Sequence, residues 1–372
     1  MNYPFEKMTY SDIRHELHNH PGISGDERFA HDLIVERLAA ARPDAVHTHV
    51  GGFGVVAVWG KDRSLPTIAV RGDIDALPTG HRCGHDGHTT ILLQVAEMIG
   101  NKELPKGHNI ILIFQPEEET GTGSQKILDA GILPPYNIRA IYGFHNLPGF
   151  PLGTAILNYH TFAAASTGVI YHLVGRQTHA STPEKGINPG LAIAEIIYEF
   201  NRLNSPANAS DNKFRQSTLI GIRAGEEAFG TSAGDAEIMF TLRAFTNSTM
   251  QQLLADARAI AGEVAAKSSL ELSVMLQEPF GATENVSACV DEIEKAAAML
   301  SLPVTYCHEP FRWSEDFGEF LRIFPGAMFG IGSGEKHPEL HHPDYDFPDD
   351  LTVSAAKLFF QLVKSFQFFS PA

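Results

Sequence analysis

The chain has 372 residues, of which 43% are hydrophobic, so it is long enough for about two domains with sizeable cores. Its formal net charge of −16 argues against nucleic acid or an anionic membrane as the main partner, but leaves a small anionic substrate open. Because Cys83, Cys289 and Cys307 make no disulfide framework, and because neither a signal-peptide core in Met1–Asp12 nor a bilayer-length apolar run is present, we expect a cytoplasmic protein.

The first part of the chain predicts alternating helices and strands. Helices are expected over residues 10–19 and 26–40, from apolar side chains at helical spacing. Short apolar runs predict the strands 53–59, 67–70, 109–114 and 139–144. The last three strands end in residues of the kind that bind metals, with helical segments between them. This order predicts a mainly parallel sheet with helices on both faces, whose strand ends share one edge.

The pattern changes after about residue 164. Strands are expected over 167–174, 218–224, 236–244 and 270–276, with helices over 188–201 and 249–266. This β-α-β-β-α-β order is that of a ferredoxin-like α+β unit, so residues 165–276 are interpreted as an inserted domain. The α/β pattern then resumes, with helices over 286–300, 315–323 and 351–366 and strands over 304–307 and 327–331. Residues 1–164 and 277–372 are therefore expected to form one catalytic domain.

The loop from Arg71 to His88 follows a predicted strand and holds three histidines, one cysteine and three aspartates. Within it, Cys83 and His85 form a Cys-x-His pair, and both side chains are good ligands for zinc-like cations. Alone, such a pair is more often incidental than metal-binding. The aspartates Asp73, Asp75 and Asp86 are more simply explained as supports for these ligands.

Candidate ligands also follow the other strands. Glu117, Glu118 and Glu119 come directly after a buried strand, and although such a cluster is normally a solvated turn, one carboxylate can bind a metal while its neighbour acts as general base. His145 ends a further strand, and His341 lies in a loop before the last helix. Taken together, these residues predict a shared site with more ligands than one tetrahedral ion uses, so we expect two metal ions.

His179 lies just after the first strand of the inserted domain, in Gly175-Arg-Gln-Thr-His179. The residues alone favour a turn or surface histidine. The other interpretation is a hydrogen-bond donor that the second domain delivers to the site.

Seven ordered motifs resemble the amidohydrolase branch of the aminoacylase/carboxypeptidase-type dinuclear metallopeptidase family, which includes N-acyl-amino-acid amidohydrolases, hippurate hydrolases and auxin-conjugate hydrolases. They cover nearly the whole chain: His15-Glu-Leu-His-Asn-His-Pro21, Arg71-Gly-Asp-Ile-Asp-Ala-Leu-Pro78, Cys83-Gly-His-Asp-Gly-His88, Phe114-Gln-Pro-Glu-Glu-Glu119, Gly143-Phe-His145, Ser314-Glu-Asp-Phe317 and Leu340-His-His-Pro343.

The resemblance implies two divalent ions per subunit, for which zinc, manganese, cobalt or nickel all fit. The ligands carried over to this chain are Cys83, His85, Glu119, His145 and His341, with Cys83 bridging the two ions. Glu118 takes the general-base position, and His179 that of a histidine which helps to hold the oxyanion in the partner subunit's site. The inserted domain is then a lid that also forms a homodimer. The implied reaction is hydrolysis of N-acyl, above all N-acetyl, amino acids, for which we name Arg243 as a candidate ligand of the substrate carboxylate.

Three departures from the family pattern bear on substrate preference. Only residues 79–82 separate Ala-Leu-Pro from the Cys-Gly-His-Asp loop, where the family has a longer segment, so one wall of the pocket is expected to be reshaped. Gln177-Thr178 replaces a common Gly-Gly before the lid histidine, and Glu117 replaces a common alanine. Three alternatives stay open: a dipeptidase or aminopeptidase with Glu117 near the substrate amine, a non-catalytic metal- or ligand-binding protein, and an enzyme with Cys83 as nucleophile.

Overall fold

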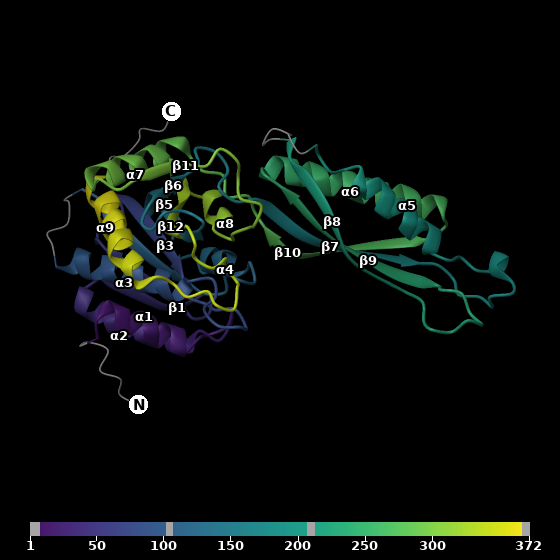
Figure 1. Ribbon diagram of the computed structural model, residues 1–372, viewed down its shortest axis with the longest axis horizontal. Coiled ribbons are helices and arrows are strands. Elements are labelled where there is room, and N and C mark those ends of the chain that lie inside the picture. The colour runs from purple at the N-terminus through teal and green to yellow at the C-terminus, as the bar shows by residue number, and fades with distance from the viewer. Residues whose placement is uncertain (1–7, 102–106, 207–212, 367–372) are drawn as a thin grey trace. The chain divides into compact units, whose positions relative to one another are not determined.

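The computed structural model describes residues 8–101, 107–206 and 213–366. It divides into two compact units, shown in Figure 1. The first unit contains Met1–Phe162, Thr283–Glu309 and Asp316–Ala372, and the second contains Ala163–Ala282 and Pro310–Glu315. The segment Pro310–Glu315 therefore packs with the second unit, whereas the sequence pattern predicts it within the domain formed by residues 1–164 and 277–372.

The first unit is built on an eight-stranded mixed sheet in the order β1-β2-β4-β3-β5-β12-β6-β11. Its central strands β4, β3, β5 and β12 are parallel neighbours, and β11 is parallel to β6. This arrangement confirms the expected mainly parallel sheet. The strand bounds are Ala45–Val50 (β1), Gly54–Trp59 (β2), Pro66–Asp73 (β3), Asn109–Gln115 (β4), Asn137–Pro148 (β5), Ala155–Leu157 (β6), Val304–Tyr306 (β11) and Gly326–Gly334 (β12).

Helices cover both faces of this sheet because its central strands are apolar on both sides. Five helices and alternate strand residues form one large core on one face. On the other face α4 and α8 pack against each other, over the sheet. The bounds are Tyr10–Asn19 (α1), Arg28–Ala41 (α2), His85–Gly100 (α3), Ser287–Met299 (α7) and Asp349–Ser365 (α9) for the first group, and Gly123–Asp129 (α4) and Gly318–Leu321 (α8) for the second.

The second unit is a four-stranded antiparallel sheet in the order β10-β7-β9-β8, with α5 and α6 packed on one face around an apolar core. Its chain order is β7-α5-β8-β9-α6-β10, which confirms the ferredoxin-like prediction. The bounds are Ala165–Val174 (β7), Gly190–Asn201 (α5), Arg215–Ala224 (β8), Asp235–Ala244 (β9), Asn247–Lys267 (α6) and Glu271–Phe280 (β10).

Two sequence expectations need correction. Strand β1 was not predicted, because its sequence Ala-Val-His-Thr-His-Val is half polar, as suits a strand at the sheet edge with one neighbour. The helix expected over 315–323 is only one turn, Gly318–Leu321. Its start is delayed because the Asp316 carboxylate is buried and held by other elements, accepting hydrogen bonds from Gln115 and the Ser124 backbone.

Among the helices that the structure describes, none is long and apolar enough to span a membrane.

Candidate metal centre

Cys83 and His85 lie where the loop after β3 turns into α3. His85 is the first residue of the helix, and Gly84 before it has φ 96°, a left-handed conformation that glycine adopts without strain. A Cβ at Gly84 would come within 2.7 Å of Asn146 Oδ1, so the loop can approach β5 this closely only with glycine there. Cys83 is 6% exposed and His85 fully buried.

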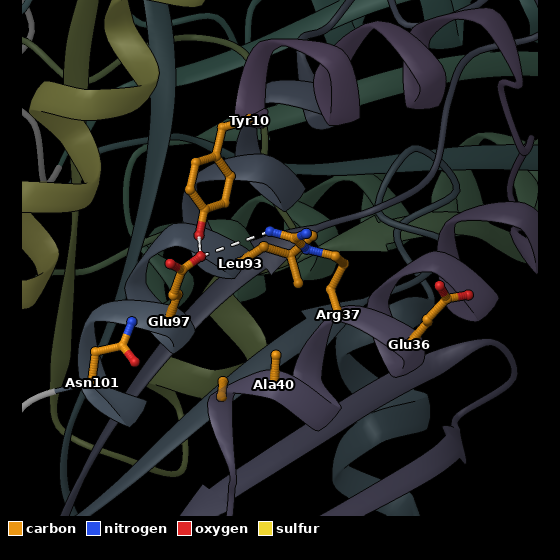
Figure 2. A pocket seen from close by; sticks show the side chains of 8 residues that line it. Tyr10, Glu36, Arg37, Ala40, Leu93, Glu97 and Asn101 are labelled. Carbon is orange, nitrogen blue, oxygen red and sulfur yellow. Dashed lines mark hydrogen bonds and ion pairs between the residues drawn. The ribbon is translucent and has the colours of Figure 1, made fainter. Parts of the chain in front are cut away.

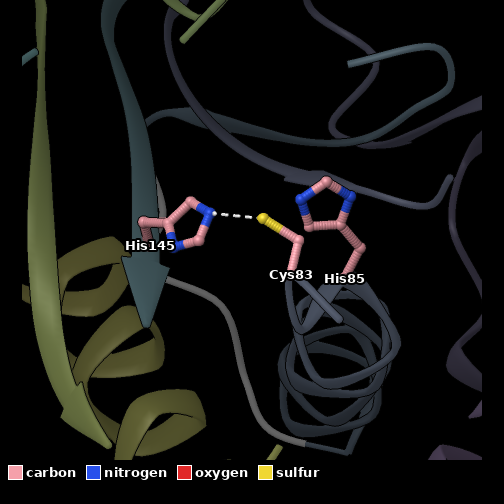
Figure 3. A group of neighbouring side chains, drawn as sticks. All are labelled: Cys83, His85 and His145. Carbon is pink, nitrogen blue, oxygen red and sulfur yellow. Dashed lines mark hydrogen bonds between the residues drawn. The ribbon is translucent and has the colours of Figure 1, made fainter. Parts of the chain in front are cut away.

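The ends of the neighbouring strands bring the other predicted ligands to this point. Cys83 Sγ lies 3.5 Å from His145 Nε2, at the end of β5, and 3.4 Å from His341 Nε2, in the loop before α9. Figure 3 shows the thiol of Cys83 between the rings of His145 and His85. His85 Nε2 lies 3.9 Å from Glu119 Oε1 and 4.0 Å from Glu118 Oε2, both just after β4.

These six side chains fall into overlapping groups whose ligand atoms lie within 4.8 Å of one another. The groups are Cys83/His85/His145, Cys83/Glu119/His341 and His85/Glu118/Glu119. Cys83 belongs to two of them, which is the position that a ligand shared by two ions needs. The residues predicted from four separate stretches of sequence thus meet in one place in the first unit.

Two of the histidines are oriented by carbonyl groups. His85 Nδ1 lies 3.0 Å from the carbonyl oxygen of Asp75, and His145 Nδ1 lies 2.9 Å from that of Asn146. Because a carbonyl can only accept, both Nδ1 atoms carry the proton and donate it. In the neutral ring, each Nε2 then has a lone pair available to the cluster, as in most histidine–metal sites.

The cluster fits a cation. His85 Nε2 and Glu119 Oε1 are both buried and have no hydrogen-bond partner within the described part of the chain. Such atoms are rare and costly in a buried site, and a bound cation would give both of them a partner. With Asp73 Oδ1 at 3.8 Å, carboxylates of three residues lie within 4.0 Å of His85 Nε2, so positive charge is favoured there.

The pKa shifts of His85 and Cys83 agree with the negative charge that surrounds them. Burial alone lowers the pKa of His85, but the charges of Asp73 and Cys83 outweigh it and raise the pKa well above its ordinary value. Burial, followed by the charge of Glu119, raises the pKa of the Cys83 thiol well above its ordinary range. A bound cation reverses this effect, because a coordinating thiol is deprotonated. Burial lowers the pKa of His145, which keeps it neutral and able to bind.

Behind the candidate ligands lies a chain of hydrogen-bonded buried groups that the sequence did not predict. His88 contacts Asp73 through Nδ1 and the Asn146 side chain through Nε2, so both its nitrogens are used. The Asn146 side chain in turn donates to the hydroxyl of Tyr345. Through Asn146, His88 thereby supports the strand end that carries His145.

The fully buried Arg71 ties the ends of β3 and β4 to the loop before α8. Its guanidinium donates to Asp73 at 2.5 Å, to Gln115 Oε1 at 2.7 Å and to Asp316 at 2.9 Å. The motifs around Arg71, Gln115 and Asp316 signalled the family resemblance, but their mutual contact spans 245 residues and could not be read from one sequence.

The short link of residues 79–82 is packed against the loop that carries His341. The Arg82 side chain donates to the carbonyl of Tyr345 at 2.6 Å, and the Arg82 carbonyl accepts the backbone N–H of His341 at 2.8 Å. His81 is 2% exposed. The short link therefore fixes the backbone of His341, one of the predicted ligands.

The two predicted site residues of the inserted domain lie in the second unit. His179 is exposed, and its Nδ1 contacts the hydroxyl of Ser181 at 2.7 Å. Arg243, on β9, donates to the carbonyl of Arg312 at 2.7 Å and to Ser314 Oγ at 2.9 Å, and so holds the segment Pro310–Glu315 in this unit. Their roles toward the metal cluster stay predictions.

A separate pocket of about 380 Å³ lies at the other end of α3, between α1 and α2 (Figure 2). Glu97 accepts a hydrogen bond from Tyr10 and lies 3.7 Å from the guanidinium of Arg37. Since Glu97 is twelve residues beyond His85 on the same helix, the two are about 18 Å apart. The pocket is therefore distinct from the metal cluster.

Comparison with known proteins decides the family. The model of Peptidase family M20/M25/M40 matches residues 69–365. The chain belongs to this family. Among curated relatives, it is 28% identical to a hippurate hydrolase of Campylobacter jejuni over 370 residues, covering 95% of each chain, and 26% identical to an N-acetylcysteine deacetylase of Bacillus subtilis, covering 94% of each. These relatives place it in the amidohydrolase branch.

Solved structures show the same fold. A putative aminohydrolase from methicillin-resistant Staphylococcus aureus aligns with a TM-score of 0.85 at 22% identity, covering 95% of both chains. A dinuclear metal-binding peptidase of the M20 family from Bacillus subtilis aligns with a TM-score of 0.81 at 24% identity, covering 95% of this chain and 96% of that one.

Proposed function

We propose that this protein hydrolyses the amide bond of N-acyl amino acids, with N-acetyl amino acids as the preferred class. It is a metal-dependent amidohydrolase of the M20 family that acts on carbon–nitrogen bonds. The observation that carries the proposal is the pair Glu118 and Glu119 beside His85 and Cys83, because it offers one carboxylate as ligand and leaves the other to move protons. The named relatives that cleave N-acyl amino acids support the substrate class.

In this proposal two divalent ions would be held by Cys83, His85, Glu119, His145 and His341, and the Cys83 thiolate would be available to both. When bound, the ions polarise the substrate carbonyl and lower the pKa of water from 15.7 towards about 7. The ligand set mixes thiolate, imidazole and carboxylate, a combination that suits zinc and that manganese, cobalt or nickel can also use.

Glu118 acts as general base and then as general acid. It is 5% exposed, so bulk solvent has little access to a proton held on its carboxylate. Glu118 takes a proton from the attacking water and passes it to the leaving nitrogen, which departs as the free amine of the amino acid. The acyl group leaves as the carboxylic acid, so one water is consumed for each amide cleaved.

The inserted domain contributes three further parts of the proposal. His179 donates a hydrogen bond to the developing oxyanion, a contribution worth about 3–4 kcal/mol in other hydrolases. Arg243 binds the substrate carboxylate. The domain also joins two subunits into a homodimer, which is supported by the exposed apolar side chains on its edge strand β8, where Leu219 is 41%, Ile220 61% and Ile222 46% exposed.

The alternatives have less support. A dipeptidase needs a free carboxylate near the substrate amine, but Glu117 is paired with Lys126 at 2.5 Å. A nucleophilic cysteine needs a lowered pKa, whereas burial raises that of Cys83. A non-catalytic binding protein has no need of a second buried carboxylate beside the ligand Glu119.

A deacylation screen tests the proposal. Chelated protein is reloaded with zinc, manganese, cobalt or nickel and assayed for free amino acid from N-acetyl and N-benzoyl amino acids, with the matching dipeptides in parallel. We expect turnover of the acylated series that depends on added metal. Faster cleavage of dipeptides would favour the peptidase alternative, activity that survives chelation would favour the cysteine nucleophile, and no cleavage of any substrate would favour a binding protein.

A further inference from the structure

The turn that carries Glu118 begins with a residue in an unfavourable backbone conformation. Glu117 has φ 54°, the left-handed region that side chains other than glycine rarely adopt. It stands between Pro116 and Glu118, so its backbone angles set the direction in which Glu118 and Glu119 leave strand β4. A conformation of this kind persists only where surrounding contacts hold it.

Contacts from two distant parts of the chain hold the backbone of this turn. Glu27, at the start of α2, is fully buried, and its Oε1 accepts the backbone N–H of Glu117 at 3.0 Å and that of Gly25 at 2.9 Å. On the far side of Glu118, the backbone N–H of Glu119 donates to Asp75 Oδ2 at 3.0 Å. Glu118 is thus flanked by two residues whose backbone amides are fixed.

The side chain of Glu117 ties the same turn to helix α4. Its Oε2 accepts hydrogen bonds from Lys126 Nζ at 2.5 Å and from Thr122 Oγ1 at 3.1 Å. Its carbonyl accepts the N–H groups of Thr122 at 3.3 Å and Gly123 at 3.2 Å, where α4 begins. Gly123 must be glycine here, since a Cβ would lie 1.6 Å from the carbonyl oxygen of Pro116.

We propose that Glu117 and Lys126 are positioning residues which, with Glu27, fix the turn from which Glu118 reaches the reacting groups. We name these three residues the Glu117 clamp. The inference rests on the proposed role of Glu118 as general base. It gives a function to one of the departures from the family pattern, the glutamate that stands where alanine is common. The Glu117 carboxylate then serves the geometry of its neighbour and makes no contact with substrate.

The clamp is suited to a kinetic test because its ion pair is partly exposed. The Lys126 side chain is 47% exposed, and pairs of this kind contribute little to stability, so Lys126→Met is expected to fold. Lys61→Met is the matched control, since Lys61 also pairs with one carboxylate in the first unit, Asp44 at 3.3 Å, but away from the turn.

The first measurement is steady-state hydrolysis of an N-acetyl amino acid at equal metal content. We expect Lys126→Met to lower kcat about 5- to 50-fold with little change in KM, because a displaced base slows the chemical step but not binding. Lys126→Arg should restore most of kcat. The kcat of the double variant Glu117→Gln/Lys126→Met should lie within about threefold of that of Lys126→Met, because both changes remove the same interaction between Glu117 and Lys126. A rise in KM alone, or equal kcat in Lys126→Met and Lys61→Met, would overturn the proposal.

The second measurement needs no activity. Hydrogen–deuterium exchange of the metal-free protein is followed in peptides that cover residues 116–124. We expect exchange there to be at least about threefold faster in Lys126→Met than in wild type or Lys61→Met. Unchanged exchange would overturn the clamp even if kcat fell. If wild type cleaves no N-acyl amino acid, the proposed function fails, while the exchange result still decides whether the clamp exists.

Discussion

At the scale of single residues, the clustering of the candidate ligands was largely predictable because they are chemically distinctive side chains at strand ends. Cys83, His85, Glu119 and His145 each follow a recognisable apolar strand, and the fold brings them together. What the sequence could not predict is which atoms support them. The contact of Glu27 with Glu117 spans 90 residues and joins two glutamates, a pairing that no local pattern indicates.

Glu27 gives a prediction about pH and stability. Burial raises its pKa from the ordinary 4.5 to about 7 in the folded protein. Folding therefore favours the protonated form: no stability is lost below about pH 4.5, the loss grows between pH 4.5 and 7, and it stays constant above. A shift of this size corresponds to about 3 kcal/mol as an upper bound.

Glu27→Gln keeps an oxygen that can accept both backbone N–H groups but has no charge to bury. We expect the variant to be more stable than wild type at pH 8 by on the order of 1–3 kcal/mol, and the difference to shrink towards zero near pH 4.5. Urea unfolding of both proteins at the two pH values measures this. A difference that is the same at both pH values would contradict the buried-carboxyl explanation.

At the scale of elements, apolar runs predicted most strands and helices, because buried strands of a parallel sheet are continuous hydrophobic segments. The expectation failed where another part of the chain decides the conformation. Strand β1 has polar side chains and forms by pairing with β2, and the helix near residue 315 is shortened because the Asp316 carboxylate is held by β3, β4 and α4.

The Asp316 carboxylate joins these elements, so removing it should cost stability. Asp316→Ala leaves the buried Arg71 with one carboxylate fewer and leaves the donors of Gln115 and Ser124 unpaired. We expect a loss of about 3–5 kcal/mol in the free energy of unfolding, measured in urea. Arg322→Ala, which removes an exposed ion pair with Glu319 beside the same helix, should cost less than about 1 kcal/mol. Equal losses in the two variants would contradict this role of Asp316.

At the scale of the whole molecule, the order of strands and helices along the chain was sufficient to predict two units, with the sequence of the second inserted into that of the first. The place where the chain passes between them was harder to predict. Residues 310–315 lie within the later α/β region of the sequence, yet they pack with the second unit, where their backbone is held by Arg243. This contact joins residues 69 positions apart and leaves no mark in the local pattern.

The proposed homodimer makes a prediction at this scale. Strand β8 is at the sheet edge, and Ile220 and Ile222 on it are exposed. We expect wild type to have the mass of a dimer in light scattering, and Ile220→Lys with Ile222→Lys to have that of a monomer, because two charges cannot be buried unpaired in an interface. Val353→Lys, at a 50% exposed site on α9, should stay dimeric. A monomeric wild type, or a dimer that survives both lysines, would contradict an interface at β8.

The central claim is that Glu118 moves the protons while its neighbour Glu119 holds metal. The most direct test is the ratio of turnover to bound metal in Glu118→Gln, with N-acetyl amino acid as substrate and metal content measured on the same sample. Gln keeps the size of the side chain but cannot accept the proton, so we expect wild-type metal content and a kcat lower by about 10²–10⁴-fold. Wild-type metal content with near-normal kcat would contradict the account.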